Sequence, residues 1–497
     1  NGSAIDRVIT NGGASGYLTL RNIKVYGGET QAADPAGRGG GIYTSRALNL
    51  IDCLVTGNAA PNANGGGIAG YAAGGRITLQ NTTVTSNSTG GQGGGIMAQS
   101  DLVITGGTVH GNTAGGQGGG VVATGGKLDI DGSSFTSNTV TGSTWGGGGL
   151  AIDVNAGSTG PFTIDDTVIS DNGTSRHGGG IYFRHGGDSK LELNHVTIED
   201  NLARTVTDSM AYGGGLSLAG AGSVDLIDSA IIDNDANTNS SGAQGGGIFM
   251  VGTGRLTVKR SVIAENAVNS TFINGQAAGG GLYVYDSEAD VSESTLSGNS
   301  TSAFAFERGG AIMVGPNHGS LAVTNSTFTG NHSDRGGAIA VIDGTASVAF
   351  STFTGNTAPQ GAVFEEVSNS LVTLRGNLID SAVNSCSGND ISSLGGNLET
   401  GTSCPLSATG DGNGLSDLGL APVSVGGEAG APSSSVDRSI YPLEDSSPAR
   451  DRVEAGDCLD ASGAALARDG RGVARPVLGK CDSGAWQQEG PAGPTGP

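Results

Sequence analysis

The sequence predicts an all-β protein, a parallel β-helix wound from a single chain, and three repeating features predict it. The first is a glycine cluster that runs directly into an aliphatic residue, and it recurs twelve times at intervals of 24 to 35 residues. The second is an apolar residue three positions before an asparagine. The third is a short segment in which apolar and polar residues alternate. Units repeated at such intervals are typical of solenoids, in which each unit forms one coil.

Each coil is predicted to hold three short strands, because each unit has three apolar segments and none has helical periodicity. One strand follows the glycines and begins at Ile42, Ile68, Ile96, Val121, Leu150, Ile181, Leu216, Ile248, Leu282, Ile312, Ile339 or Val363. A second is half-buried and alternates, as in 77–79, 102–104, 128–130, 162–164, 191–193, 224–226, 256–258 and 321–323. The third carries the apolar residue before the asparagine. Roughly thirteen such coils at a spacing of about 4.8 Å make a rod about 60 Å long.

The recurring asparagines are interpreted as a structural ladder. Asparagine tolerates the left-handed backbone conformation of a corner, and amides stacked on successive coils hydrogen-bond along the rod. The glycines allow a positive φ and close packing of the backbone. The ladder residues are Asn58, Asn87, Asn112, Asn138, Asn172, Asn201, Asn234, Asn266, Asn299, Asn331 and Asn356.

Composition and charge exclude several classes of protein. The 93 glycines show no three-residue period in the body of the chain, which excludes collagen there. A net charge of −22 opposes binding to nucleic acid or to anionic lipid. The sequence has no apolar run of about 18 residues, so we expect no membrane span. An acidic surface suits an extracellular or cell-surface protein and attracts divalent cations.

The cysteines divide the chain at about residue 376. Cys53 stands alone and is predicted to be a buried thiol. Cys386, Cys404, Cys458 and Cys481 lie in the last fifth, where the repeats dissolve, and they indicate two disulfides and an oxidising compartment. Four cysteines can pair in three ways, and we favour the way that joins sequence neighbours, Cys386–Cys404 and Cys458–Cys481. The predicted parts are a β-helix over 1–376, an irregular disulfide-tied C-terminal cap over 377–489 and the start of a collagen-like tail over 490–497.

Two parts of the sequence resemble known families. Gly-Gly-Ala-Ile at 309–312 and 336–339, with the Phe-x-x-Asn motifs at 135–138, 328–331 and 353–356, resembles the repeats of chlamydial polymorphic membrane proteins. The end of the chain resembles the choice-of-anchor Q domain of bacterial surface β-helix proteins. It shares Gly-Asn-Leu at 396–398, Ser-Pro-Ala-x-Asp at 447–451, Asp-x-Arg-Gly-x-x-Arg-Pro at 469–476 and Cys-Asp-x-Gly-Ala at 481–485. These resemblances imply that the β-helix, with its three short strands in each coil, is right-handed, that the protein is secreted or surface-exposed, and that it has a role in adhesion.

One group of carboxylates is the candidate metal site. Asp171, Asp200, Asp233 and Glu265 precede the corner asparagine on four successive coils. Like charges at one coil spacing repel. A Ca²⁺ ion bound by oxygen ligands would relieve the repulsion, and so would solvation at an exposed corner. No other cofactor is predicted.

Two functions remain open. The first is an extracellular, non-enzymatic rod, an adhesin or a structural subunit of a surface layer or fibre. Its partners would be other copies of itself, forming a trimer through the collagen-like tail, or host and surface glycans. The alternative is a polysaccharide lyase or hydrolase with a groove along the β-helix, its ligand lying over the long coils at 201–213, 234–245 and 266–279. Tyr212, Phe272, Tyr283 and Tyr285 are the aromatic residues near them. Arg176-His177 and Arg184-His185 flank one glycine cluster and are expected to be exposed loop residues.

Overall fold

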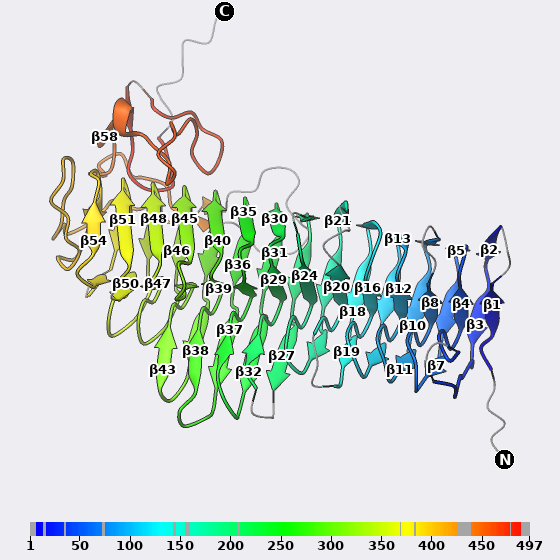
Figure 1. Ribbon diagram of the computed structural model, residues 1–497. Helices are drawn as coiled ribbons and strands as arrows, with labels where there is room; N and C mark the ends of the chain where they lie inside the picture. Colours follow the sequence, from blue (N-terminus) through cyan, green and yellow to red (C-terminus); the bar gives the residue numbers. More distant parts are fainter. Residues whose placement is uncertain are drawn as a thin grey trace, which may run out of the picture. The chain divides into compact units, whose positions relative to one another are not determined.

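The computed structural model describes residues 6–488 except 13–15, 34–35, 72–74, 143–145, 155–159, 188, 206–208, 368, 382–383, 423, 426–438 and 478. The predicted collagen-like tail lies outside these residues. The described chain is built from short strands and turns, with one 3₁₀ helix at Ala455–Asp457 (Figure 1). No helix in the described part is long and apolar enough to cross a bilayer.

The chain divides into two compact units. Unit 1 comprises Asn1–Asp225, Ile231–Phe249 and Ser270–Phe272. Unit 2 comprises Leu226–Ala230, Met250–Asn269 and Ile273–Pro497. Three strands have residues in both units, namely β30 (Ser223–Ile227), β31 (Ala230–Ile232) and β34 (Ile248–Val251).

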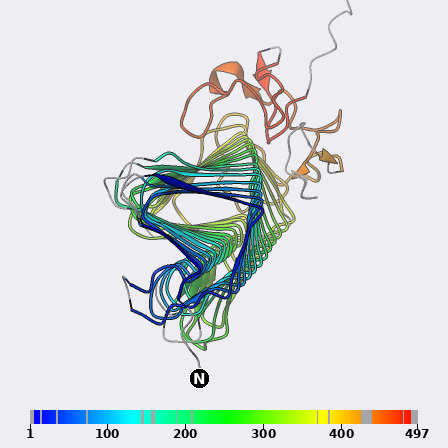
Figure 2. The same ribbon diagram turned by 90° about the vertical axis from the view of Figure 1, so that its right-hand side faces the viewer.

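Unit 1 is a parallel β-solenoid whose strands form three main sheets (Figure 2). The first sheet contains β1 (Ile9–Asn11), β4 (Ile42–Thr44), β8 (Ile68–Gly70), β12 (Ile96–Ala98), β16 (Val121–Ala123), β20 (Leu150–Val154), β24 (Ile181–His185) and β29 (Leu216–Gly220). The second contains β3 (Lys24–Tyr26), β6 (Leu54–Thr56), β10 (Thr83–Thr85), β14 (Thr108–His110), β18 (Ser134–Thr136), β22 (Val168–Ser170) and β26 (Thr197–Glu199). The third contains β2 (Tyr17–Arg21), β5 (Ala47–Ile51), β9 (Arg76–Gln80), β13 (Asp101–Thr105), β17 (Leu128–Asp131), β21 (Phe162–Asp165) and β25 (Lys190–Asn194).

Unit 2 repeats this arrangement in its own coils. Its first sheet contains β39 (Leu282–Tyr285), β44 (Ile312–Val314), β47 (Ile339–Ile342), β50 (Phe364–Val367) and β53 (Cys386–Ser387). Its second contains β36 (Val262–Ala264), β41 (Thr295–Ser297), β46 (Thr327–Thr329), β49 (Thr352–Thr354), β52 (Leu378–Asp380) and β55 (Leu398–Glu399). Its third contains β35 (Arg255–Lys259), β40 (Glu288–Ser292), β45 (Ser320–Thr324), β48 (Thr345–Ala349), β51 (Leu371–Arg375) and β54 (Ile391–Ser393). Parallel pairing therefore continues to Glu399, beyond residue 376.

The predicted alignment of aliphatic residues is confirmed, with one correction. Ile42 pairs with Ile68, Ile96 pairs with Val121, and all four are fully buried. The twelfth position is wrong, because Ile339 pairs with Phe364 rather than with Val363. The left-handed glycine at Gly361 sets this register, since each such glycine stands three residues before the first inward residue of the strand.

The glycine clusters serve both predicted purposes. Gly118 has a φ of +63°, which turns the chain into the first sheet. A Cβ on Gly119 or Gly120 would lie 2.5 Å from a carbonyl oxygen of the next coil, so no larger residue fits there without displacing the backbone. The clusters thus set both the corner and the spacing of the coils.

A fourth, narrower sheet was not predicted. In unit 1 it lies between the second and first sheets of each coil and contains β7 (Ala59–Ala60), β11 (Ser88–Thr89), β15 (Thr113–Ala114), β19 (Thr139–Val140), β23 (Gly173–Thr174), β27 (Leu202–Thr205) and β32 (Asp235–Thr238). Most of these strands are two residues long, which is too short to show alternation in the sequence. The described first sheet has fourteen strands, eight wholly in unit 1, five wholly in unit 2 and β34 with residues in both, which is close to the prediction of roughly thirteen coils.

The asparagines form a buried amide ladder in each unit. In unit 1, Asn172 Nδ2 donates to Asn201 Oδ1 at 3.0 Å and to the Phe135 carbonyl at 2.8 Å, while its Oδ1 accepts from Asn138 Nδ2 at 3.0 Å. In unit 2 the same bond joins Asn266 to Asn299, Asn299 to Asn331 and Asn331 to Asn356. The amides satisfy backbone groups that the corners would otherwise leave unpaired inside the protein.

The left-handed residue of this corner is not the asparagine. It is the residue before it, which has a positive φ at Gly57, Ser86, Gly111, Ser137, Asp171, Asp200, Asp233, Glu265, Gly298, Gly330 and Gly355. Its side chain, where present, faces outward, and the turn it makes directs the asparagine inward. The sequence argument placed the positive φ one residue too late.

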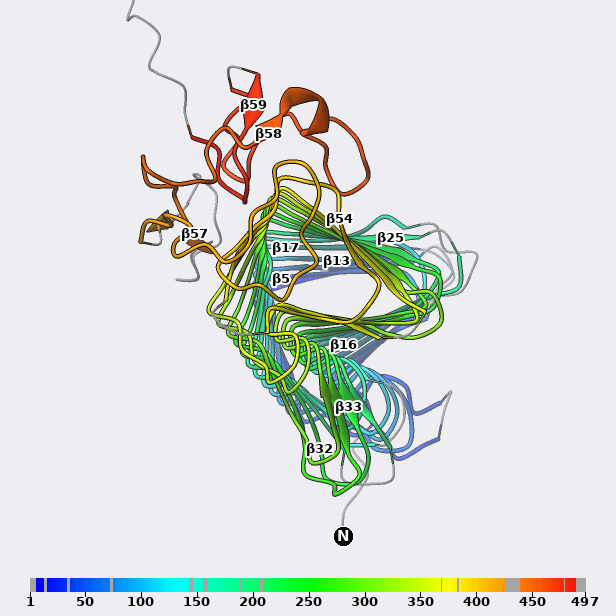
Figure 3. The same cartoon turned by 90° about the vertical axis from the view of Figure 1, so that its left-hand side faces the viewer.

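The C-terminal segment, residues 441–488, packs along the side of the last coils of unit 2 (Figure 3). The structure forms the favoured disulfides, Cys386–Cys404 and Cys458–Cys481, and Cys53 is a buried free thiol. Val453 and the second disulfide pack against Ala349 and Phe350 on the outside of one coil. Thr352 is also covered by this segment, since its Oγ1 accepts from the Ala485 N–H at 3.1 Å and it is only 1% exposed.

The arginine-rich motif of this segment forms its own network. The Arg475 guanidinium is fully enclosed; it lies 4.9 Å from the Phe350 ring centroid and donates to the carbonyls of Asp482 and Gly484. Burial lowers the pKa of Arg475 to about 10, so it stays protonated at neutral pH. The Arg471 guanidinium lies 3.2 Å from the Trp486 ring centroid and pairs with Asp469 at 2.8 Å.

Candidate functional site

The predicted carboxylate group lies where the sequence placed it, on exposed corners. Asp171, Asp200 and Asp233 all have left-handed backbones and belong to unit 1, whereas Glu265 belongs to unit 2. Partial burial, and then the charges of Asp233 and Asp171, raise the pKa of Asp200. Within the described residues, no group of three or more His, Cys, Asp or Glu side chains is arranged to hold a metal ion. Calcium binding at these carboxylates stays a prediction.

This repulsion gives a testable pH dependence. Asp200→Asn keeps a residue that tolerates a positive φ and removes one charge, so we expect a melting temperature higher by on the order of 1 °C at pH 7. A carboxyl whose folded pKa is raised binds its proton more tightly in the folded state. Its destabilising effect therefore grows as pH rises from its ordinary pKa through the raised value, and disappears below both. The gain from the substitution, followed by thermal unfolding at pH 3 to 8, should vanish at the acid end. A gain equal at all pH values would contradict the repulsion.

The two histidines near one glycine cluster are structural, which corrects the expectation that they are exposed. His177 is 7% exposed and its ring stacks 4.8 Å from that of Tyr212, with Tyr182 5.7 Å away. Burial, and then the charge of Arg176, lower the pKa of His177 to about 3, so it is neutral at physiological pH. His185 is 2% exposed and contacts the backbone of Gly187 through Nδ1.

The aromatic residues of the long coils are also engaged in packing. The Tyr212 ring lies 4.6 Å from that of Phe249, in addition to its contact with His177. Tyr283 is 4% exposed and stacks 6.4 Å from Tyr285. Among these aromatics, Phe272 retains an exposed face, at 36%. Three of the four rings are thus already in contact with protein rings.

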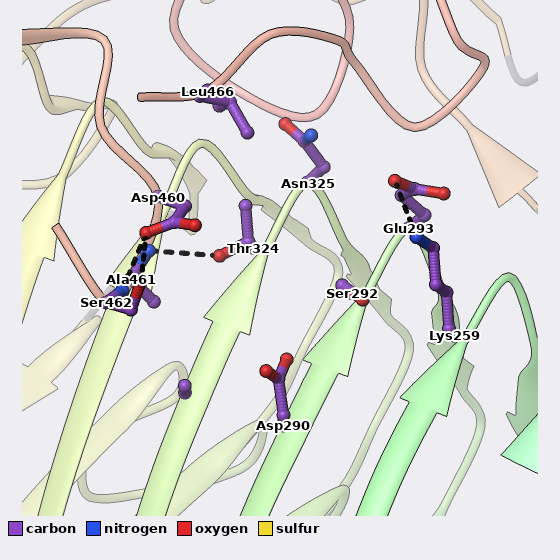
Figure 4. A pocket seen from close by; sticks show the side chains of 11 residues that line it. Lys259, Asp290, Ser292, Glu293, Thr324, Asn325, Asp460, Ala461, Ser462 and Leu466 are labelled. Carbon is purple, nitrogen blue, oxygen red and sulfur yellow. Dashed lines mark hydrogen bonds and ion pairs between the residues drawn. The ribbon is translucent and has the colours of Figure 1, made fainter. Parts of the chain in front are cut away.

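A pocket that the sequence did not predict lies between the third sheet of unit 2 and the C-terminal segment (Figure 4). It encloses about 210 Å³. Its floor is the outer face of β35, β40 and β45, and its wall is the loop from Asp460 to Leu466. The residues lining it are Lys259, Asp290, Ser292, Glu293, Ala322, Thr324, Asn325, Asp460, Ala461, Ser462 and Leu466.

Hydrogen bonds fix the loop over the sheet. The Ala461 N–H donates to Thr324 Oγ1 at 3.1 Å, and Asn325 Nδ2 donates to the Arg468 carbonyl at 2.8 Å. Asp460 Oδ1 accepts from the N–H groups of Ser462 and Ala464 and from the Ser462 hydroxyl. The loop is therefore tied to the third sheet near both of its ends.

The pocket is rich in carboxylates. Burial raises the pKa of Asp290; the nearby Arg255, at 3.6 Å, lowers it and the charge of Asp460 raises it further. Lys259 Nζ lies 3.9 Å from Glu293 Oε1. The pocket thus has more hydrogen-bond acceptors than donors, and Asp290 among them is partly shielded from solvent.

Two further cavities lie in unit 2. One, of about 220 Å³, lies on the other side of the Asp460 loop and is lined by Ser347, Thr373 and Arg375 among others. Another, of about 300 Å³, lies beside His332 and Pro359. The first pocket is lined by three carboxylates, whereas these cavities have one and none, and the carboxylate-lined pocket is therefore the candidate binding site.

Comparison with known proteins identifies the family. A family described as the right-handed β-helix region matches residues 8–234 and 150–398, which together cover most of the chain. No curated protein and no solved structure shows a significant match. The matched residues coincide with the stacked coils described above. The chain therefore belongs to the right-handed β-helix family.

Proposed function

We propose that the protein is an extracellular, non-enzymatic rod that acts as an adhesin or as a structural subunit of a surface layer or fibre. The proposal rests on the location of the side chains whose pKa values are shifted most strongly. In enzymes such groups gather in a cleft, facing the substrate. Here they are enclosed in packed protein, as His177 and Arg475 show.

A buried carboxylate of unit 2, Glu365, supports the same proposal, because its charge is used between coils. Glu365 is 2% exposed and lies 3.3 Å from Arg308 and 3.4 Å from Arg335. Both arginines stand directly before glycine clusters, so this pair joins neighbouring coils. Partners of such a scaffold would be other copies of the chain or surface glycans, because its polar outer faces present repeated hydroxyl and carboxylate groups at coil spacing.

One observation favours the alternative, a carbohydrate-active enzyme. Asp290 has a raised pKa and shares a pocket with Asp460 and Glu293. Glycoside hydrolases use two carboxyl groups, one of which is protonated as the general acid. These three carboxyl groups are therefore the candidates for the acid and base that the alternative function requires.

An assay on polysaccharides separates the two functions. The purified chain is incubated with a panel of neutral and acidic polysaccharides, with and without calcium, and binding and chain length are measured on the same samples. We expect retention of some polysaccharides on immobilised protein with no change in their size distribution. Depolymerisation that Asp290→Asn abolishes would overturn the proposal in favour of the enzyme.

A further inference from the structure

The carboxylate-lined pocket contains acceptors that the protein itself leaves unused. Asn325 is 4% exposed, its Nδ2 is bonded to the Arg468 carbonyl, and its Oδ1 has no partner in the described structure. Asp460 receives its three hydrogen bonds on Oδ1 alone, which leaves Oδ2 available (Figure 4). A buried unpaired acceptor costs free energy unless a ligand or water satisfies it.

The size of the pocket limits what it can bind. At about 210 Å³ it falls below the range of about 300–1,000 Å³ for sites that enclose drug-sized ligands. Its lining combines hydroxyls and carboxylates with the small apolar surfaces of Ala322, Ala461 and Leu466. This is the chemistry that a single ring bearing several hydroxyl groups would satisfy, because each hydroxyl donates to an acceptor while its carbons rest on apolar surface.

The charge of the lining limits the ligand further. Asp290, Glu293 and Asp460 contribute three carboxylates and Lys259 one ammonium, which lies beside Glu293. A ligand carboxylate would meet repulsion here, whereas a neutral ring or an ammonium group would not.

We propose that this pocket binds one sugar residue of a glycan, and that it selects neutral or amino sugars over uronic acids. The inference rests on the proposed adhesive function and assigns it a contact site. The Asn325 amide oxygen accepts from one hydroxyl, and Asp460 and Asp290 accept from others or from an amino group.

Binding is tested with the full chain by saturation-transfer NMR against the methyl glycosides of glucose, galactose, mannose, glucosamine and glucuronic acid. We expect saturable binding of at least one neutral or amino sugar and at least tenfold weaker binding of the glucuronide. Equal or stronger binding of the glucuronide would overturn the charge argument. An absence of binding by all five would overturn the pocket assignment.

Three variants locate the site. Ala322→Phe fills the pocket and should abolish binding, while Val103→Phe, at the equivalent outward position of β13, should leave it unchanged. Asn325→Gly keeps the left-handed backbone (φ +50°) and removes the unpaired oxygen, so it should weaken binding about tenfold. Asn325→Asp also loses the bond to Arg468 but retains an acceptor, and should bind neutral sugars as the unmodified protein does. Equal losses in Asn325→Gly and Asn325→Asp would assign the effect to the loop instead.

Failure here is distinguishable from failure of the proposed function. If Ala322→Phe leaves polysaccharide retention intact, the chain is an adhesin that binds elsewhere. If polysaccharide is depolymerised, the adhesive function itself is wrong, whichever sugars the pocket accepts.

Discussion

Asn172→Ala is expected to lower the free energy of unfolding by about 3–5 kcal/mol. The substitution removes the bonds from Asn172 Nδ2 to the Phe135 carbonyl and to Asn201 Oδ1. It also removes the acceptor of two donors on Asn138, its backbone N–H at 2.9 Å and its Nδ2 at 3.0 Å. Asn201 Oδ1 keeps the Asn172 backbone N–H and Asn138 Nδ2 keeps the Val109 carbonyl, but each loses one bond, and the Asn138 N–H and the Phe135 carbonyl lose theirs to this side chain, all in the buried interior. The loss therefore exceeds that of a single hydrogen bond.

The measurement is urea unfolding followed by circular dichroism, with amide hydrogen exchange to show where protection is lost. Because a solenoid is stabilised by contacts between neighbouring coils, exchange should rise first at Asn138 and Asn201. The matched control is Asp171→Asn at the adjacent exposed corner, which should change stability by less than about 0.5 kcal/mol. Similar losses in the two variants would show that the amide ladder is not what stabilises the corner.

Arg475→Met is expected to release the C-terminal segment from the coils of unit 2, at a cost of about 3–5 kcal/mol. The guanidinium donates to the carbonyls of Asp482 and Gly484, and both lie in the stretch that touches the coils. The Ala485 N–H in that stretch donates to Thr352 Oγ1, and the Ser483 hydroxyl donates to the Gly396 carbonyl. Methionine fills similar space beside Phe350 but satisfies neither carbonyl.

Limited proteolysis checks this expectation, because a released segment is cleaved while the coils remain resistant. Arg468→Met is the control, since Arg468 is exposed and its guanidinium donates to the Gly472 carbonyl within the same segment. The segment also forms one wall of the carboxylate-lined pocket. Arg475→Met should therefore lose sugar binding as well, whereas Arg468→Met should not. Unchanged protease resistance would mean that the disulfide and the apolar contacts suffice to hold the segment.

The interior of the coils was predictable because it follows from local periodicity. Leu128 and Ile130 alternate with polar residues in sequence, and both are fully buried in β17. Two features of the coils were missed because periodicity does not indicate them. Two-residue strands such as β15 are too short to show alternation. The register of the strand at Phe364 depends on which glycine of the cluster takes the positive φ.

The candidate site was not predictable in the same way. Ala461 lies 137 residues from the Thr324 that it contacts, and nothing in either segment indicates this approach. No pattern in the sequence therefore indicates that Asp290 and Asp460 line the same pocket. The exposed corner carboxylates could be predicted because they recur with the coil period. That period indicates their position but not whether they bind an ion.

The outward-facing residue that precedes each ladder asparagine offers a consequence for engineering. Glycine, serine, aspartate and glutamate all occupy this position in the chain, so the coil tolerates chemically different groups there. Their side chains recur at the distance between hydrogen-bonded strands, about 4.8 Å. Within one unit, dyes, chelators or peptide epitopes attached at this corner position would therefore be spaced regularly, one per coil, without contacting the interior.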